Sequence, residues 1–434
     1  MEKIKCDVLI CGGGVAGISA AVAAARTGAN TILAEAEAML GGTASLGLNC
    51  SFEGSDVNLL GGNFAEIVDR LKSKNGIILG SYAPFSISSF QDVCFEMLKE
   101  AKVKVLYRMK AVSISNSFLV TFETPSGNVL IEAKSVVDAT GNGDVCACAG
   151  VDFELGDPSS GEIQPITLLF RMGNVDIEKL MDYVSSEDQF YHEKLLFVCD
   201  QTKNPPLLIG NGFFKWVEKE KQEGLICARE GIAIIITPNP KEVLINATRI
   251  NQINALDSFQ MSEAIEALYE QKISLVSHLK KKMPGFANAY VIDHASFPGI
   301  RETRRIMGLY QLTVQDIMEG REFDDCIARN SFPVDVHGPK SNPEGYRWIV
   351  PGGKGYYDIP LRCIMAKGKA GLFMAGRCIS TTHDAHGSTR TMPCCIATGQ
   401  AAGIGATLYH NNIMLEELKK KVQLQLGRQG VPIK

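Results

Sequence analysis

The sequence lacks several features that would assign it to particular classes of protein. No apolar run approaches the roughly 18 residues that a membrane-spanning helix requires, so we expect no membrane partner. Basic residues are not in excess: the formal net charge is −4 at pH 7, and no basic stripe favours a nucleic-acid partner. The opening residues, MEKIKCDVLICGGG, lead directly into a predicted strand, so a secretory signal peptide is not expected.

Cysteine spacings typical of metal sites are also missing. The 13 cysteines are scattered, and the only close pairs are Cys146/Cys148 and Cys394/Cys395. Neither pair matches the C-x₂-C repeats of zinc sites or the cysteine runs of iron–sulfur clusters, so no metal site is predicted. Scattered thiols without a signal peptide favour a cytoplasmic location. The 434 residues, 45% apolar and 21% charged, are expected to form a globular protein of two or three domains.

The first forty residues carry a dinucleotide-binding pattern. An apolar strand runs into Gly12, Gly14 and Gly17, an Ala-rich helix follows, and a second strand ends in Glu35. Gly12 permits a tight turn, Gly14 lets the backbone approach a pyrophosphate, and Gly17 lets the helix lie close to the strand. Glu35 stands where a carboxylate accepts hydrogen bonds from an adenosine ribose. Because all parts occur in order, we expect a dinucleotide site.

Three later segments favour FAD over NAD. Gly41 and Gly42 follow the second strand, a buried strand breaks at Thr140-Gly141, and a late strand ends at Gly376-Arg377. An NAD-only Rossmann domain is contiguous and needs no such return of the chain.

This order of segments resembles the glutathione-reductase-like FAD fold. It is closer still to the FAD-dependent oxidoreductases related to the flavin portion of heterodisulfide reductase. The segments that carry the likeness are DATGNGD, QPITLLFRMGNVD, GIRETRRIMGLYQLTVQDI, IPLRCIMAKG and LFMAGRCISTTHDAHGSTRTMPCCIATGQAAG. The resemblance implies non-covalent FAD, lined by Gly12, Gly14, Gly17, Glu35, Gly41, Gly42, Thr140, Gly141, Gly376 and Arg377.

The sequence departs from these relatives in its electron-transfer groups. It has no cysteine runs for iron–sulfur clusters, and Cys50 alone follows the first nucleotide unit where disulfide reductases place a redox pair. There is no second G-x-G-x-x-G in strand context for an NAD(P)H domain. The electron path is therefore expected to differ from theirs.

The expected fold class is α/β, a Rossmann-like FAD-binding domain with an inserted α+β substrate domain. Residues 1–150 would form the first FAD-binding segment and 151–345 the substrate or cap domain, with 295–320 close to the flavin. Residues 346–412 would return to the FAD-binding domain, and 413–434 would hold a final helix. Helices are also predicted at 62–75, 89–101 and Ser262–Met283, and residues Ser331–Gly355, rich in proline and glycine, are predicted as loop.

The stretch STRTMPCCIATGQAAGIGATLY predicts a helix whose N-terminus points at the flavin ring. Negative charge builds on the ring when a hydride arrives, and a helix N-terminus offers free N–H groups there. Pro393 suits the first helical turn, and we expect Pro393, Cys394 and Cys395 to lie against the cofactor.

Four polar residues are candidate catalytic groups. HGSTR resembles the H-G-x-x-R element of fumarate-reductase-like flavoproteins, which implies that His386 and Arg390 face the substrate. His386 could move a proton and Arg390 could hold an anionic group. His383 and, in GIRETRRI, Arg301 are further candidates. The alternative is that these residues cap the helix, bond the backbone or form ordinary salt bridges.

The sequence thus predicts a flavoenzyme that exchanges a hydride and a proton with a small polar organic molecule. One alternative is a flavin-bearing electron-transfer subunit with a separate electron carrier, and another is an NAD-dependent dehydrogenase. The substrate, the direction of reaction, the electron acceptor and the oligomeric state, including a homo-oligomer, stay open.

Overall fold

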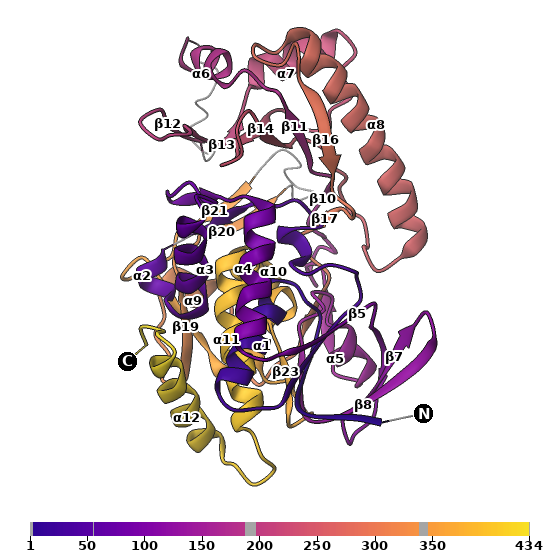
Figure 1. Cartoon of the computed structure of the whole chain (residues 1–434), viewed down its shortest axis with the longest axis vertical. Helices are drawn as coiled ribbons and strands as arrows, with labels where there is room; N and C mark the ends of the chain where they lie inside the picture. The colour runs from indigo at the N-terminus through magenta and orange to yellow at the C-terminus, as the bar shows by residue number, and fades with distance from the viewer. Residues whose placement is uncertain (1–2, 55, 187–196, 338–345, 434) are drawn as a thin grey trace.

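A computed structural model describes residues 3–54, 56–186, 197–337 and 346–433. Figure 1 shows two bodies: a larger one that holds both chain ends, and a smaller one above it built around α8 (Ser258–Lys282). Each has its own hydrophobic core, and that of the smaller body is formed by residues between Phe170 and Ala289. Among the described residues, no helix is both long and apolar enough to cross a membrane.

A seven-stranded sheet organises the larger body. Its central strands are parallel: β1 pairs with β2 and β8, and β23 pairs with β8 from the far end of the sequence. Interior strands of this kind are covered on both faces, and Leu9 and Ile10 of β1 are fully buried. The strands are β5 (Lys104–Tyr107), β2 (Thr31–Glu35), β1 (Lys3–Cys11), β8 (Gly127–Asp138), β7 (Leu119–Thr124), β6 (Lys110–Ile114) and β23 (Leu372–Met374).

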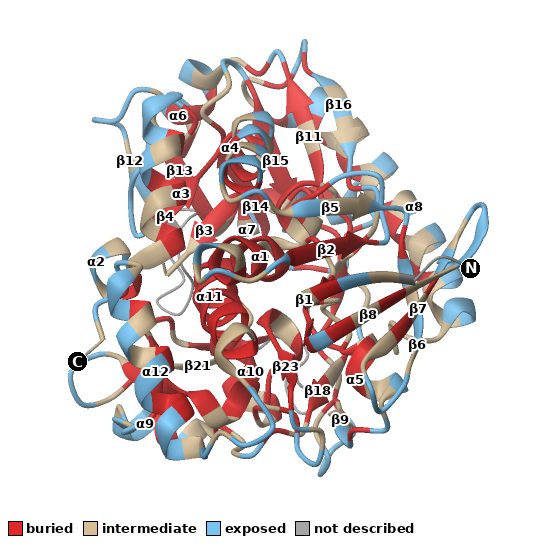
Figure 2. Cartoon of the chain, turned by 60° about the horizontal axis from the view of Figure 1, so that its bottom comes forward, coloured by how far each residue is buried: buried red, intermediate tan, exposed pale blue. Residues whose placement is uncertain are grey.

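Two helices, α1 (Val15–Arg26) and α11 (Met392–Leu408), lie side by side in the centre of this body (Figures 1 and 2). Both are almost wholly buried, as the red ribbon of Figure 2 shows. They approach closely because glycine stands at the contact. A Cβ added at Gly399 would lie 2.1 Å from the Ala16 carbonyl oxygen, and one at Gly403 would lie 2.0 Å from that of Ala20. This contact brings residues from both ends of the chain together.

The smaller body is a six-stranded antiparallel sheet with helices on one face. Alternate residues of its strand β14 face opposite sides, as in any strand. Ile232, Ile234 and Ile236 pack in the core with the helices, whereas Ala233 and Ile235 face the larger body. Its elements are β12 (Phe197–Asp200), β13 (Leu207–Gly212), β14 (Ile232–Ile236), β15 (Val243–Asn246), β11 (Phe170–Gly173), β16 (Tyr290–His294), α6 (Ile177–Ser186), α7 (Phe214–Gln222) and α8.

Short elements complete the larger body and the joint between the two. They are η1 (Gly42–Ala44), β3 (Ser51–Glu53), α2 (Val57–Leu60), α3 (Gly62–Ser73), β4 (Tyr82–Pro84), α4 (Ile87–Glu100), α5 (Asp144–Cys148), β9 (Phe153–Leu155), β10 (Ile166–Thr167), β17 (Gly299–Ile300), β18 (Arg304–Ile306), α9 (Val314–Glu319), β19 (Cys326–Asn330), β20 (Val334–His337), β21 (Tyr346–Ile349), β22 (Tyr357–Pro360), η3 (Leu361–Ile364), η4 (Gly376–Cys378), α10 (His383–Thr389) and α12 (Leu415–Arg428).

Most predicted helices lie within a few residues of their observed positions. The helix predicted from Ser262 begins at Ser258, because Asp257 caps it by accepting from the backbone N–H groups of Phe259 and Gln260. The prediction of loop over Ser331–Gly355 is wrong in part, since β20 and β21 form an antiparallel pair there. Residues 338–345 of that stretch lie outside the described part of the chain.

The packing also divides the chain differently from the expected boundary at residue 345. Leu312, Ile327 and Val334 belong to the core of the larger body. The reason is strand pairing: β19 pairs with β22, which holds this segment on the FAD-binding side rather than in the smaller sheet.

The contact between α1 and α11 is testable with a matched pair of substitutions. We expect Gly403→Ala to lower the free energy of unfolding by about 1–3 kcal/mol, because the added methyl forces the two backbones apart. Gly427→Ala is the control, since a Cβ at this position of α12 meets nothing within 4 Å. It should be neutral or stabilising by about 0.5 kcal/mol. Denaturant unfolding measures both, and equal effects would contradict the packing argument.

Candidate functional site

A cavity of about 830 Å³ runs from the first glycine turn to the underside of the smaller sheet. Its walls come from the carboxyl ends of β1, β2, β8 and β23, from the start of α11, and from β13, β14 and β15. In parallel sheets this edge is the usual place for a bound ligand.

The glycine turn forms one end of the cavity. Gly12 has φ +102°, and a Cβ there would lie 2.4 Å from the Ala139 carbonyl oxygen, so the turn requires glycine. Gly14 is the N-cap of α1 and has no side chain to cap the helix. A Cβ at Gly14 would meet nothing within 4 Å. The helix therefore presents free N–H groups and its positive end to open space, which suits a phosphate.

Glu35 ends β2 beside this turn and lines the cavity. Its carboxylate accepts hydrogen bonds from the Gly13 N–H and, at 2.7 Å, from the Glu37 N–H. Burial raises the pKa of Glu35, and these backbone donors oppose the rise. The two bonds hold the carboxylate at the cavity edge, where it can also accept from a ribose hydroxyl.

Most of the residues expected to contact the cofactor line the cavity. These are Gly12, Gly14, Glu35, Gly42, Thr140, Gly141, Gly376, Arg377 and Cys395. Gly17, Gly41, Pro393 and Cys394 are not among the lining residues. Gly17 instead supports the turn, since a Cβ there would lie 1.8 Å from the Gly12 carbonyl oxygen. Gly41, at φ +104°, donates its N–H to the Gly13 carbonyl at 2.8 Å.

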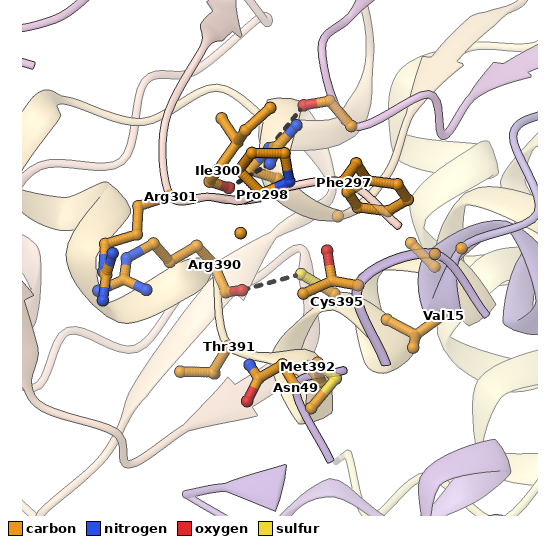
Figure 3. A pocket seen from close by; sticks show the side chains of 18 of the residues that line it. Val15, Asn49, Phe297, Pro298, Ile300, Arg301, Arg390, Thr391, Met392 and Cys395 are labelled. Atoms are coloured by element: carbon orange, nitrogen blue, oxygen red, sulfur yellow. Dashed lines mark hydrogen bonds between the residues drawn. The ribbon is translucent and has the colours of Figure 1, made fainter. Parts of the chain in front are cut away.

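The start of α11 presents only one side to the cavity. Met392 and Cys395 line it because residues three apart share a helix face. Pro393 and Cys394 lie between them and are buried on other sides of the helix. Figure 3 shows Met392 and Cys395 beside Thr391 and Arg390 around the same pocket.

Arg377 ties three separate segments together at the cavity wall. It donates to the Gly141 carbonyl at 2.9 Å, to Asn142 Oδ1 at 2.8 Å, and to the Ile300 carbonyl. Burial lowers the pKa of this guanidinium. The re-entrant strand, the end of β8 and the β17 segment thus share one buried cation.

The two histidines do not line the cavity. His386 is fully buried, its Nε2–H donates to the Arg377 carbonyl at 2.9 Å, and burial lowers its pKa to about 3. His383 donates from Nδ1 to Glu302 at 2.9 Å, and Glu302 also pairs with the buried Arg305. The structure therefore places both imidazoles in a polar network behind Arg377 rather than facing a substrate.

Arg301 and Arg390 do reach the cavity, and Figure 3 shows their guanidinium groups side by side at one end of it. Arg301 donates to the Pro165 carbonyl at 2.8 Å and to Thr167 Oγ1 at 2.9 Å. Arg390 donates to the Asp335 carbonyl at 2.9 Å and to its carboxylate at 3.2 Å. Burial, together with the charges of Arg390 and Arg249, lowers the pKa of Arg301 to about 9.

Sequence reasoning missed four polar residues of the cavity: Glu53, Arg229, Asp335 and His337. Asp335 accepts from His337 Nε2 at 2.9 Å as well as from Arg390. Glu53 makes no hydrogen bond or ion pair with any described side chain. Burial raises the pKa of Glu53 to about 7; Asp335 adds to the rise, and Arg390 and Arg301 oppose it. The only available signal was a charged residue in each of two short strands, and one of those strands was predicted as loop.

Comparisons with known proteins agree with this site. A model of the family "FAD dependent oxidoreductase" matches residues 7–425. A flavin-dependent brominase of known structure is 11% identical, with 98% of this chain and 84% of that chain covered and a TM-score of 0.51. A geranylgeranyl bacteriochlorophyll reductase-like protein from Thermoplasma acidophilum is 14% identical, covers 98% and 84%, and has a TM-score of 0.48. No curated protein matches this sequence.

The residues at the glycine turn fit FAD. The uncapped N-terminus of α1, the open space beside Gly14 and the carboxylate of Glu35 supply what a pyrophosphate and a ribose need.

Gly14 separates the demands of folding from those of cofactor binding. We expect Gly14→Asp to keep or slightly raise stability, because aspartate is a good N-cap. It should weaken FAD binding at least about tenfold more than Gly14→Asn, since only the aspartate repels the pyrophosphate. Titration of the apoprotein with FAD, followed by flavin fluorescence, gives both dissociation constants. Equal affinities would contradict the placement of the phosphates.

Proposed function

Because this chain belongs to the family of FAD-dependent oxidoreductases, we propose that it transfers a hydride between a small polar organic substrate and non-covalently bound FAD. One observation carries the proposal. The cavity that begins at Gly12 and Gly14 continues without interruption into a chamber walled by Arg301 and Arg390. A cofactor and a second, polar molecule can therefore share one enclosed space.

Bound FAD supplies the two-electron chemistry. Gly12, Gly14 and the N-terminus of α1 would hold its pyrophosphate, and Glu35 would accept from its ribose. Met392 and Cys395, at the N-terminus of α11, would lie against the ring system, where the positive end of the helix stabilises negative charge. The return of the chain through β23 and α11 supports a fold of the glutathione-reductase type.

Arg301 and Arg390 would orient the substrate, because their guanidinium groups reach the cavity. Oxidation of a carbon that bears a hydroxyl or amine group releases a proton together with the hydride. Glu53 is placed to accept that proton, since it lines the chamber and its carboxylate has no partner among the described residues. His386 and His383 would act as positioning residues, which hold Arg377 and Glu302.

A substrate screen tests the proposed function. Under anaerobic conditions, we expect at least one sugar, amino acid or dicarboxylate to bleach the flavin. Arg390→Ala should slow that reduction at least about tenfold, because a charge-assisted hydrogen bond to the substrate is lost. Arg428→Gln, an exposed position at the end of α12, is the control. If only protein electron carriers reduce the flavin, the electron-transfer alternative replaces the proposal.

The protonation state of Glu53 predicts a pH dependence. A base must be deprotonated, so the rate constant for flavin reduction should rise with pH through about 7 and then level off. The charged or titratable groups that face Glu53 are Tyr82, Asp335, Arg301 and Arg390.

Glu53→Gln should abolish this pH step and slow reduction by about 100-fold or more. The exposed Glu123→Gln should retain both the rate and the step, and His386→Asn should retain the step because His386 stays neutral above pH 5. Stopped-flow measurements between pH 5 and 9 give the profiles, and a Glu53→Gln profile with the same step would contradict the assignment.

A further inference from the structure

Two arginines in the chamber face the cavity without a carboxylate partner among the described residues. Arg229 donates only to Asn246, to its carbonyl at 2.9 Å and its side-chain oxygen at 3.0 Å. Arg301 donates only to the Pro165 carbonyl and to Thr167 Oγ1. Both side chains line the cavity. Their charges are therefore buried beside neutral acceptors, an arrangement that is costly unless an anion completes it.

The acidic groups nearby do not remove this imbalance. Asp335 is already shared between Arg390 and His337. Glu53 is the other acid in the chamber, and burial raises its pKa, so it is only partly charged at neutral pH. The pKa of Arg301 falls because of burial and the like charges of Arg390 and Arg249, with a further contribution from Arg229. An anionic ligand would relieve all of these effects together.

The wall opposite the arginines is apolar. Ala233 and Ile235 face the chamber from β14, and Ile209 faces it from β13, because alternate residues of this sheet point away from the helices. Met261 and Ile265, four residues apart on α8, extend the same wall. A ligand that fills the chamber therefore meets positive charge at one end and hydrocarbon at the other.

We propose that the substrate is an organic carboxylate with an apolar body, whose carboxylate lies between Arg301 and Arg229 and whose body packs beneath β13 and β14. The planar guanidinium fork matches a carboxylate with two parallel hydrogen bonds. This inference rests on the proposed function, because it treats the chamber as the substrate end of the flavin site. It narrows the class of substrate from small polar molecules to amphipathic acids.

Binding to the oxidised holoenzyme tests the inference without turnover. The probes are acetate, butyrate, hexanoate and the neutral analogue hexanamide, and calorimetry and flavin absorbance report their binding. We expect hexanoate to bind at least about tenfold more tightly than hexanamide. Affinity should rise roughly threefold for each methylene group from acetate to hexanoate, because each added group leaves water for the apolar wall.

Substitutions assign the charge recognition to the arginines. Arg301→Gln should bring hexanoate close to the affinity of hexanamide, and Arg301→Lys should restore part of the difference. Arg428→Gln should leave the difference unchanged. FAD content, read from the absorbance spectrum, confirms that each variant is folded around its cofactor.

Equal binding of hexanoate and hexanamide, absence of saturable carboxylate binding, or an unchanged preference in Arg301→Gln would each overturn the inference. The outcome is separable from that of the proposed function. Tight carboxylate binding with no metabolite able to reduce the flavin would leave the inference standing and refute hydride transfer. Reduction by a neutral substrate, with no preference for carboxylates, would do the reverse.

Discussion

The contact between α1 and α11 is the constraint on which the site depends. Glycine at positions 399 and 403 lets two helices from opposite ends of the sequence meet backbone to backbone. Because the helices begin at the same edge of the parallel sheet, their positive ends converge on one cavity. One end can hold a pyrophosphate, and the other can stabilise charge on a ring system. A larger side chain at either glycine would separate these two functions.

Arg377 transmits this arrangement to the substrate side of the cavity. It joins the segment after β23 to the end of β8 and to the Ile300 carbonyl, one residue before Arg301. His386 donates to the carbonyl of Arg377 from behind, and His383 holds Glu302 next to Arg301. A buried polar network of this kind tolerates little displacement, because each group that loses its partner carries a desolvation cost. The histidines thus support the site from outside the cavity.

The chamber combines groups from both bodies of the molecule. Arg301, Arg390 and Glu53 come from the larger body, and Arg229 comes from the smaller one. Such a division suits a site at the joint between two structural units, where enclosed pockets commonly lie. The apolar face of the smaller sheet closes the chamber and excludes water, which strengthens every electrostatic interaction inside it. The size and charge of the ligand are therefore set by how the two bodies meet.

The FAD-binding turn, the return of the chain and the position of Arg390 beside α11 could all be predicted from the order of the amino acids. Those features depend on local requirements: glycine where φ is positive, as at Gly12, and small residues where backbones approach. Which polar side chains reach the cavity depended instead on tertiary packing. His386 belongs to a suggestive motif yet is buried behind Arg377, and Glu53 belongs to no motif yet faces the chamber. Burial and pKa depend on contacts between segments that are distant in sequence, and no local pattern records them.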